Sequence, residues 1–266
     1  MLFRSRILAR ALLAGERRAV WLGQIAQRHS RYAGIARLGR ILCALTGASF
    51  GLVTEGANAA GAWMAGAVPH RHAGGAPRAH TGLHARAMLE GGLSGYVLLG
   101  ALDAPFDFTA DVASLARAEF VLCVSPHCSG ALRDAAHVIL PIGSFAETAG
   151  TFVNCEGRWQ SWNGAVKAVG ESRPGWKVLR VLGNLLALPG FEYNSAEEVR
   201  EAVHKLHAAA GKPAAEGGAP KSLGAEPSSH AGSGWAPVPI YQVDALVRRS
   251  PSLSGTRAGL AAGAGA

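Results

Sequence analysis

Cysteine is scarce in this chain, with four residues among 266 (Cys43, Cys123, Cys128 and Cys155). Their number and irregular spacing exclude a disulfide-scaffolded secreted domain and suit a reducing compartment. Charged residues are also few, at 17%, and the net charge of +8 is not gathered into blocks of like charge. Because aromatic residues do not interleave with the arginines as a stacking platform requires, we expect no nucleic-acid partner and a basic surface that meets acidic protein neighbours.

Long apolar runs are absent as well. The longest, over residues 178–188, is interrupted by Arg180 and Gly183, and none reaches the roughly 18–20 residues that a membrane span needs. We therefore expect no direct membrane insertion. The basic N-terminal stretch lacks the continuous apolar region of a signal peptide, because charged residues at 16–18 interrupt it. It is interpreted as a helix that begins abruptly, as in a piece of a longer protein.

Several signatures of enzymes and metal sites are missing. The chain has no Rossmann glycine pattern, no Walker lysine and no G-x-S-x-G elbow. Cys123 and Cys128 have the spacing of the first step of a plant-type ferredoxin motif, but the next ligand position holds Ala131. Four histidines lie near one another without cysteine or carboxylate partners, namely His70, His72, His80 and His84. We therefore expect neither an iron–sulfur cluster nor another metal in this chain.

What the chain does contain is a regular alternation of strand and helix patterns up to Gly150. Short runs of β-forming residues predict strands at 19–22, 50–53, 96–99, 120–124 and 138–140. Helical patterns lie between them, at 32–45, in a small-residue segment ending at Ala67, at 83–89 and at 111–118. This order indicates an α/β domain over residues 1–150, with a doubly wound, mostly parallel sheet.

The remainder is expected to divide into three parts. Residues 151–207 predict a polar turn region and a helical extension, in which Ser195 and Glu198 form a capping box at the start of a helix. Residues 208–234 are rich in Ala, Gly, Pro and Ser and predict a flexible linker. Residues 235–266 regain apolar content and are interpreted as a docking tail.

Two polar turns are candidate binding sites. The first follows the strand at 50–53 and opens a helix, where backbone N–H groups and the helix dipole favour a phosphate. Its residues are Thr54, Glu55, Gly56 and Asn58. The second follows the strand that Pro141 stops, and its residues are Glu147, Thr148, Gly150, Thr151, Asn154, Glu156, Gly157 and Arg158. Its donors and acceptors either hold a ligand or satisfy one another, and Glu156 with Arg158 suits a charge-assisted pair.

The order E-T-x-G-T-F-x-N-x-E-G-R within the second turn resembles the segment that closes the pterin-cofactor domain of the molybdopterin oxidoreductases. The continuation through R-P-x-W-K-V-L-R at 173–180 and L-G-N at 182–184 resembles more specifically the C-terminal part of the G subunits of bacterial NADH-quinone oxidoreductase, respiratory complex I. The tail segment at 237–253 resembles the end of the same subunits. In molybdopterin enzymes, turns like the one at 54–58 cradle a pterin dinucleotide.

This resemblance implies a structural and assembly role in the peripheral arm of an enzyme that passes electrons from NADH to quinone and couples this to proton translocation. The partners would be the other peripheral-arm subunits, on the cytoplasmic side of the bacterial inner membrane. No catalytic centre and no cofactor are expected in this chain. Iron–sulfur clusters would belong to an N-terminal part of the full-length subunit, and the twelve turn residues would be vestigial pterin-site positions, with molybdopterin itself not retained.

A second interpretation comes from the same motif. The chain would then be part of a true molybdopterin-dependent oxidoreductase, such as a formate dehydrogenase, in which the two polar turns bind a working cofactor. The segment R-P-G-W-K-V-L-R-V-L-G-N-L-L and the tail favour the complex I interpretation.

Overall fold

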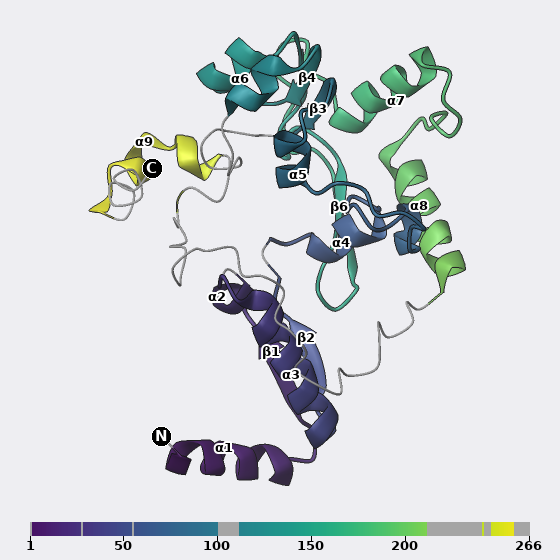
Figure 1. The fold of residues 1–266 in the computed structure, drawn as a ribbon. Helices are drawn as coiled ribbons and strands as arrows, with labels where there is room; N and C mark the ends of the chain where they lie inside the picture. The colour runs from purple at the N-terminus through teal and green to yellow at the C-terminus, as the bar shows by residue number, and fades with distance from the viewer. Residues whose placement is uncertain are drawn as a thin grey trace. The chain divides into compact units, whose positions relative to one another are not determined.

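The computed structural model describes residues 2–27, 29–54, 56–100, 112–211, 241 and 246–257 (Figure 1). The chain divides into two compact units. The first unit includes the residues up to Ala60 and the turn Val153–Arg158, and the second includes Gly61–Phe152, Trp159–Gly211 and the residues from Val238 onward. Among the described residues, no helix has the length and apolar content needed to cross a membrane.

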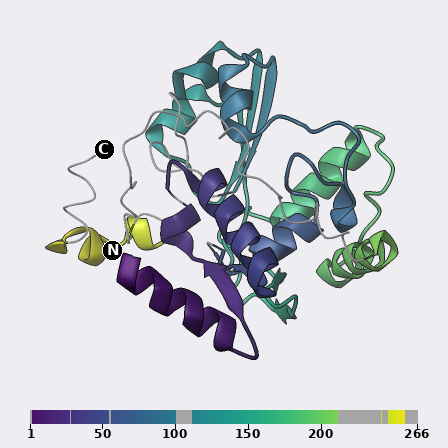
Figure 2. The ribbon, with the colours of Figure 1, turned by 60° about the horizontal axis from the view of Figure 1, so that its bottom comes forward.

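The first unit is built around a β–α–β crossover. Strands β1 (Ala19–Leu22) and β2 (Ser49–Leu52) pair in parallel, with Val20 opposite Phe50. Helix α3 (Tyr32–Thr46) connects them and packs along both strands, as Figures 1 and 2 show. The unit also contains α1 (Leu2–Ala14), α2 (Gln24–Gln27) and the start of α4 (Ala59–Met64).

The close approach of α3 to its sheet depends on glycine. A Cβ atom at Gly39 would lie 2.9 Å from the ring of Phe50, so a larger residue there would push the helix from the strand. The helix ends at Gly47, whose φ of 70° is the left-handed conformation that glycine adopts without steric cost. Its N–H donates to the carbonyl of Cys43, which satisfies one of the last carbonyls of the helix.

The second unit contains a parallel sheet of three strands, in the order β3 (Gly95–Leu99), β4 (Phe120–Ser125) and β5 (Val138–Pro141). The 3₁₀ helix η2 (Val112–Arg117) precedes β4, α6 (Gly130–Ala135) connects β4 to β5, and α5 (Ala85–Glu90) precedes β3. These helices cover one side of the sheet. The core between them consists of Leu89, Tyr96, Leu98, Leu115, Ala118, Val121, Leu132 and Ala135.

Two further strands, β6 (Gly150–Val153) and β7 (Trp159–Trp162), form a sheet of their own, and all of their residues except Val153 belong to the second unit. Helices α7 (Gly175–Leu185) and α8 (Ala196–Ala210) follow in sequence, and η3 (Val247–Arg249) and α9 (Pro251–Ser254) lie near the C-terminus. Helix α8 packs against the short 3₁₀ helix η1 (Ala73–Gly75). This contact is close, because the imidazole Nδ1 of His207 lies 3.0 Å from the carbonyl oxygen of Gly74.

The α/β class and the parallel strands are confirmed, with every predicted strand present to within one residue. Two details differ. The five parallel strands form two separate sheets, one in each unit, rather than one continuous sheet. The helix predicted at 111–118 is a 3₁₀ helix over Val112–Arg117. Most of the predicted linker and tail lies outside the described residues, namely 212–240, 242–245 and the residues after 257. Helix α8 extends into the start of the predicted linker, as far as Ala210.

Candidate functional site

Glu147, the first candidate residue of the second polar turn, is bonded to the backbone of its own unit. One carboxylate oxygen accepts from the N–H of Ser144 at 2.7 Å, and the other accepts from the N–H of Val169 at 2.9 Å. These hydrogen bonds hold the pKa of Glu147 below its usual range, because they favour the charged form. The bond from Ser144 therefore stays within the turn, and the bond from Val169 ties the turn to a loop that lies 22 residues further along the chain.

The neighbouring candidates Thr148, Gly150 and Thr151 belong to the same unit and are engaged in a similar way. The hydroxyl of Thr148 donates to the carbonyl of Ser144 at 3.3 Å, and the hydroxyl of Thr151 lies 2.9 Å from that of Ser161 on β7. A Cβ atom at Gly150 would lie 2.3 Å from the indole of Trp162. The glycine thus makes room for a side chain of this protein.

In the first unit, Asn58 has a long-range structural partner. Its side-chain oxygen accepts from the N–H of Val153 at 2.8 Å, which joins two segments 95 residues apart. Gly56 precedes it with a φ of 77°, the left-handed conformation that the turn requires. Thr54 lies in the same turn, whereas Glu55 lies outside the described residues.

The remaining candidates form the tight turn between β6 and β7. The side-chain oxygen of Asn154 accepts from the N–H groups of Glu156 and Arg158 at 3.0 and 2.9 Å, and Gly157 has a φ of 81°. The side chains of Glu156 and Arg158 are both exposed. A charge-assisted pair of these two side chains would therefore lie in solvent, which screens both charges and weakens their attraction.

These bonds bear on whether a pterin fits. A pterin or its phosphates would need side-chain donors and acceptors aimed at the ligand. Here the carboxylate of Glu147 and the amide oxygens of Asn58 and Asn154 accept from backbone N–H groups of the protein itself. The arrangement fits braced turns better than it fits a loaded cofactor site.

Two cysteines, Cys123 and Cys128, lie next to each other, but the described cysteines and histidines form no larger group. Cys43 and Cys123 are buried, Cys155 is exposed, and burial together with the neighbouring Cys128 raises the pKa of Cys123 to about 11. Of the predicted histidine group, His84 accepts from the N–H of Ala87 at the start of α5. In the part of the chain that the structure describes, no three histidine, cysteine or acidic residues are placed to share a metal ion.

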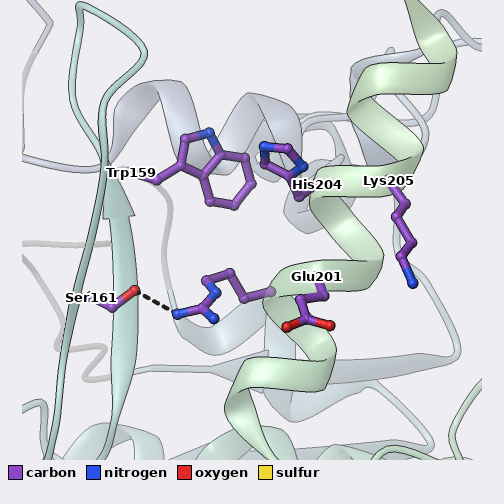
Figure 3. Close-up of a pocket in the computed structure, with 6 residues that line it drawn as sticks. Trp159, Ser161, Glu201, His204 and Lys205 are labelled. Carbon is purple, nitrogen blue, oxygen red and sulfur yellow. Dashed lines mark hydrogen bonds between the residues drawn. The ribbon is translucent and has the colours of Figure 1, made fainter.

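A pocket that the sequence analysis did not identify lies between β7 and α8 (Figure 3). It has a volume of about 370 Å³ and is lined by Trp159, Ser161, Arg200, Glu201, His204 and Lys205. The rings of Trp159 and His204 meet edge to face, with centroids 5.3 Å apart. The guanidinium of Arg200 donates to the hydroxyl of Ser161 at 3.1 Å. A signal for it exists in the sequence, since residues 200 and 204 lie one turn apart on a helix and 159 and 161 share a strand face.

The chain is similar to a known protein family and to short stretches of several longer proteins. The family described as molybdopterin oxidoreductase matches residues 4–185. The F420-dependent formate dehydrogenase 1 subunit alpha of Methanococcus maripaludis is 40% identical over 72 residues, which are 27% of this chain and 11% of that protein. The NADH-ubiquinone oxidoreductase 75 kDa subunit of Reclinomonas americana is 41% identical over 66 residues, 24% of this chain and 9% of that protein.

A third relative is the mitochondrial NADH-ubiquinone oxidoreductase 78 kDa subunit of Candida albicans, which is 43% identical over 51 residues. That match covers 19% of this chain and 7% of the relative. The chain thus aligns with about a tenth or less of the length of these relatives. Identities are similar for the formate dehydrogenase subunit and for the two NADH-ubiquinone oxidoreductase subunits.

Proposed function

Because the chain belongs to the molybdopterin oxidoreductase family, we propose that it is a peripheral-arm subunit of an NADH-quinone oxidoreductase with a structural and assembly role. In that role its fold is kept as a scaffold, while the redox centres lie elsewhere in the assembly. The enzyme as a whole would pass electrons from NADH to quinone and couple this to proton translocation. The similarity to the 75 and 78 kDa subunits of two NADH-ubiquinone oxidoreductases supports this proposal.

One observation carries the structural role. The best-placed polar side chains of the two candidate turns, Glu147, Asn58 and Asn154, accept hydrogen bonds from the backbone of their own unit. Each of these side-chain oxygens is already engaged in bracing its own loop and is therefore less available to a cofactor. We therefore propose that no molybdopterin is held at Thr54, Gly56 or the other turn positions, and that the turns stabilise the fold.

The partners would be the other peripheral-arm subunits, with the assembly on the cytoplasmic side of the bacterial inner membrane. Iron–sulfur clusters of such an enzyme would not use the cysteines of this chain, because in the described part of the chain no three cysteine, histidine or acidic residues are placed to share a metal ion. We propose neither a nucleic-acid partner nor direct membrane insertion.

A second candidate is supported by the 40% identity to a formate dehydrogenase alpha subunit. In that case the polar turns would hold a working pterin, and the hydrogen bonds of Glu147 and Asn154 would rearrange around it. The two candidates therefore differ in molybdenum content and in the electron donor.

The test is purification of the affinity-tagged protein from its own cells under anaerobic conditions. We expect NADH-dependent quinone reduction to co-purify with it, with molybdenum far below one atom per chain. The exposed Arg158 supplies a variant: Arg158→Ala should leave assembly and NADH oxidation per assembled complex near normal. Stoichiometric molybdenum with formate-dependent activity would overturn the proposal in favour of the formate dehydrogenase. An assembled Arg158→Ala complex that no longer oxidises NADH would overturn the purely structural role of the turn.

A further inference from the structure

The pocket between β7 and α8 lies entirely within the second unit and is separate from the backbone bonds of Glu147 and Asn154. In Figure 3, Trp159 and Ser161 project from the strand toward the helix, and His204 on α8 projects toward Trp159. A second, smaller pocket of about 180 Å³ shares Ser161 and Arg200 with it. Arg200 therefore lies at the boundary between two hollows on one face of the unit.

The lining is organised before any ligand binds. The guanidinium of Arg200 donates to Ser161, whose hydroxyl lies 2.9 Å from that of Thr151 on β6. Helix α8 begins at the side-chain cap of Ser195 and is held at its other end by the contact of its last turns with Gly74. A guanidinium held in place loses little entropy when it binds a carboxylate, and its planar fork matches both carboxylate oxygens.

The charge of the lining is basic. Arg200 and Lys205 stand against the single acid Glu201, in a chain whose net charge is +8. Beside these groups the half-buried indole of Trp159 offers an apolar surface. Tryptophan and arginine in one pocket are the residue types that most often dominate the binding energy of protein interfaces.

From this combination we propose that the pocket binds an acidic segment of a partner protein, through one carboxylate on Arg200 and one aromatic side chain against Trp159 and His204. The inference rests on the proposed function, in which the segment belongs to another subunit of the arm. A volume of about 370 Å³ suits one large side chain and its neighbour. Small-molecule sites enclose about 70–90% of their ligand, whereas Ser161, Glu201, His204 and Lys205 are all exposed here.

The test uses the full chain and a fluorescein-labelled peptide in which glutamates flank one central phenylalanine, with binding followed by fluorescence anisotropy in a buffer without phosphate. Arg200→Gln should weaken binding about ten-fold or more, as expected for an interface anchor. The matched control is Arg133→Gln, which removes the same charge from the exposed surface of α6 and should change the affinity less than about two-fold. Replacing the phenylalanine of the peptide by serine should also weaken binding.

Three further measurements separate the alternatives. Thermal unfolding must show that Arg200→Gln remains folded. Arg200→Lys keeps the charge but loses the planar fork, so it should bind the peptide with an affinity between those of the unchanged protein and Arg200→Gln. Equal weakening by Arg200→Gln and Arg133→Gln would show unspecific charge attraction and would overturn the proposal. So would displacement of the peptide by AMP or inorganic phosphate at concentrations near the dissociation constant of the peptide. Failure of the protein to co-purify with NADH oxidation would leave this assay unchanged, so the two proposals fail separately.

Discussion

Substitution of Gly74 by alanine tests whether α8 is held in place by its contact with η1. Gly74 is buried with φ 85° and ψ −7°, and a Cβ atom there would lie 2.7 Å from the carbonyl carbon of Leu206 and 2.8 Å from its oxygen. These are backbone atoms of a helix, so they cannot rotate away as the end of a side chain would. Either the loop or the helix has to move.

The expected cost has two parts. A non-glycine residue in the left-handed region costs about 1–2 kcal/mol, and overpacking against fixed atoms costs about 1–3 kcal/mol. Alanine has less conformational freedom than glycine in the unfolded chain, which offsets about 0.4–1 kcal/mol of this cost. We therefore expect Gly74→Ala to lower the free energy of unfolding by about 2–4 kcal/mol. At about 2–4 °C per kcal/mol for a chain of this size, the melting temperature should fall by several degrees or more.

Gly92→Ala is the matched control. Gly92 has φ 62°, but no atom lies within 4 Å of its hypothetical Cβ, so only the conformational part applies. Thermal unfolding followed by circular dichroism should show a clearly larger loss for Gly74→Ala than for Gly92→Ala. Adding Leu206→Ala should not rescue the first variant, because the clash is with the backbone of Leu206. Equal losses in the two glycine variants would refute the close contact of α8 with η1.

Three other predictions follow from single contacts. Because the pKa of Glu147 is lowered in the folded protein, its charged form stabilises the fold above the ordinary carboxyl pKa, and this stability is lost as the pH falls through the lowered value. In Glu147→Gln the melting temperature should therefore fall less steeply with decreasing pH, and an unchanged profile would contradict this. The thiol of Cys123 is buried and has a pKa of about 11, so it should react with iodoacetamide at neutral pH far more slowly than the exposed Cys155. Peptide mass spectrometry measures both rates, and equal rates would contradict the burial of Cys123. Asn58→Ala leaves the N–H of the buried Val153 without its acceptor, so urea unfolding should show a free energy of unfolding lower by about 1–3 kcal/mol. The control Asn163→Ala, at an exposed position, should lower it by about 0.5 kcal/mol or less.

Local features of the fold were accessible from the sequence, because they depend on residues close together in the chain. Runs of β-forming residues predicted β1 and β4, and Pro141 marked the end of β5. The capping box at α8 is confirmed, with the N–H of Glu198 bonded to the hydroxyl of Ser195 at 3.1 Å. The glutamate returns its bond to the N–H of Asn194 rather than to that of Ser195, a shift of one residue that spacing alone does not reveal.

The sequence by itself therefore determined the order of strands and helices, the class of the fold and the position of the polar turns. Only the tertiary structure decided what those turns contact: Glu147 meets Val169, and Asn58 meets Val153 across 95 residues of chain. It also decided that Trp159 on β7 faces His204 on α8, which makes a pocket of residues 45 positions apart in sequence. Periodicity indicates which face of a helix or strand is apolar. The partner of a polar side chain depends instead on how distant segments pack together, which the sequence of a single helix or strand does not show.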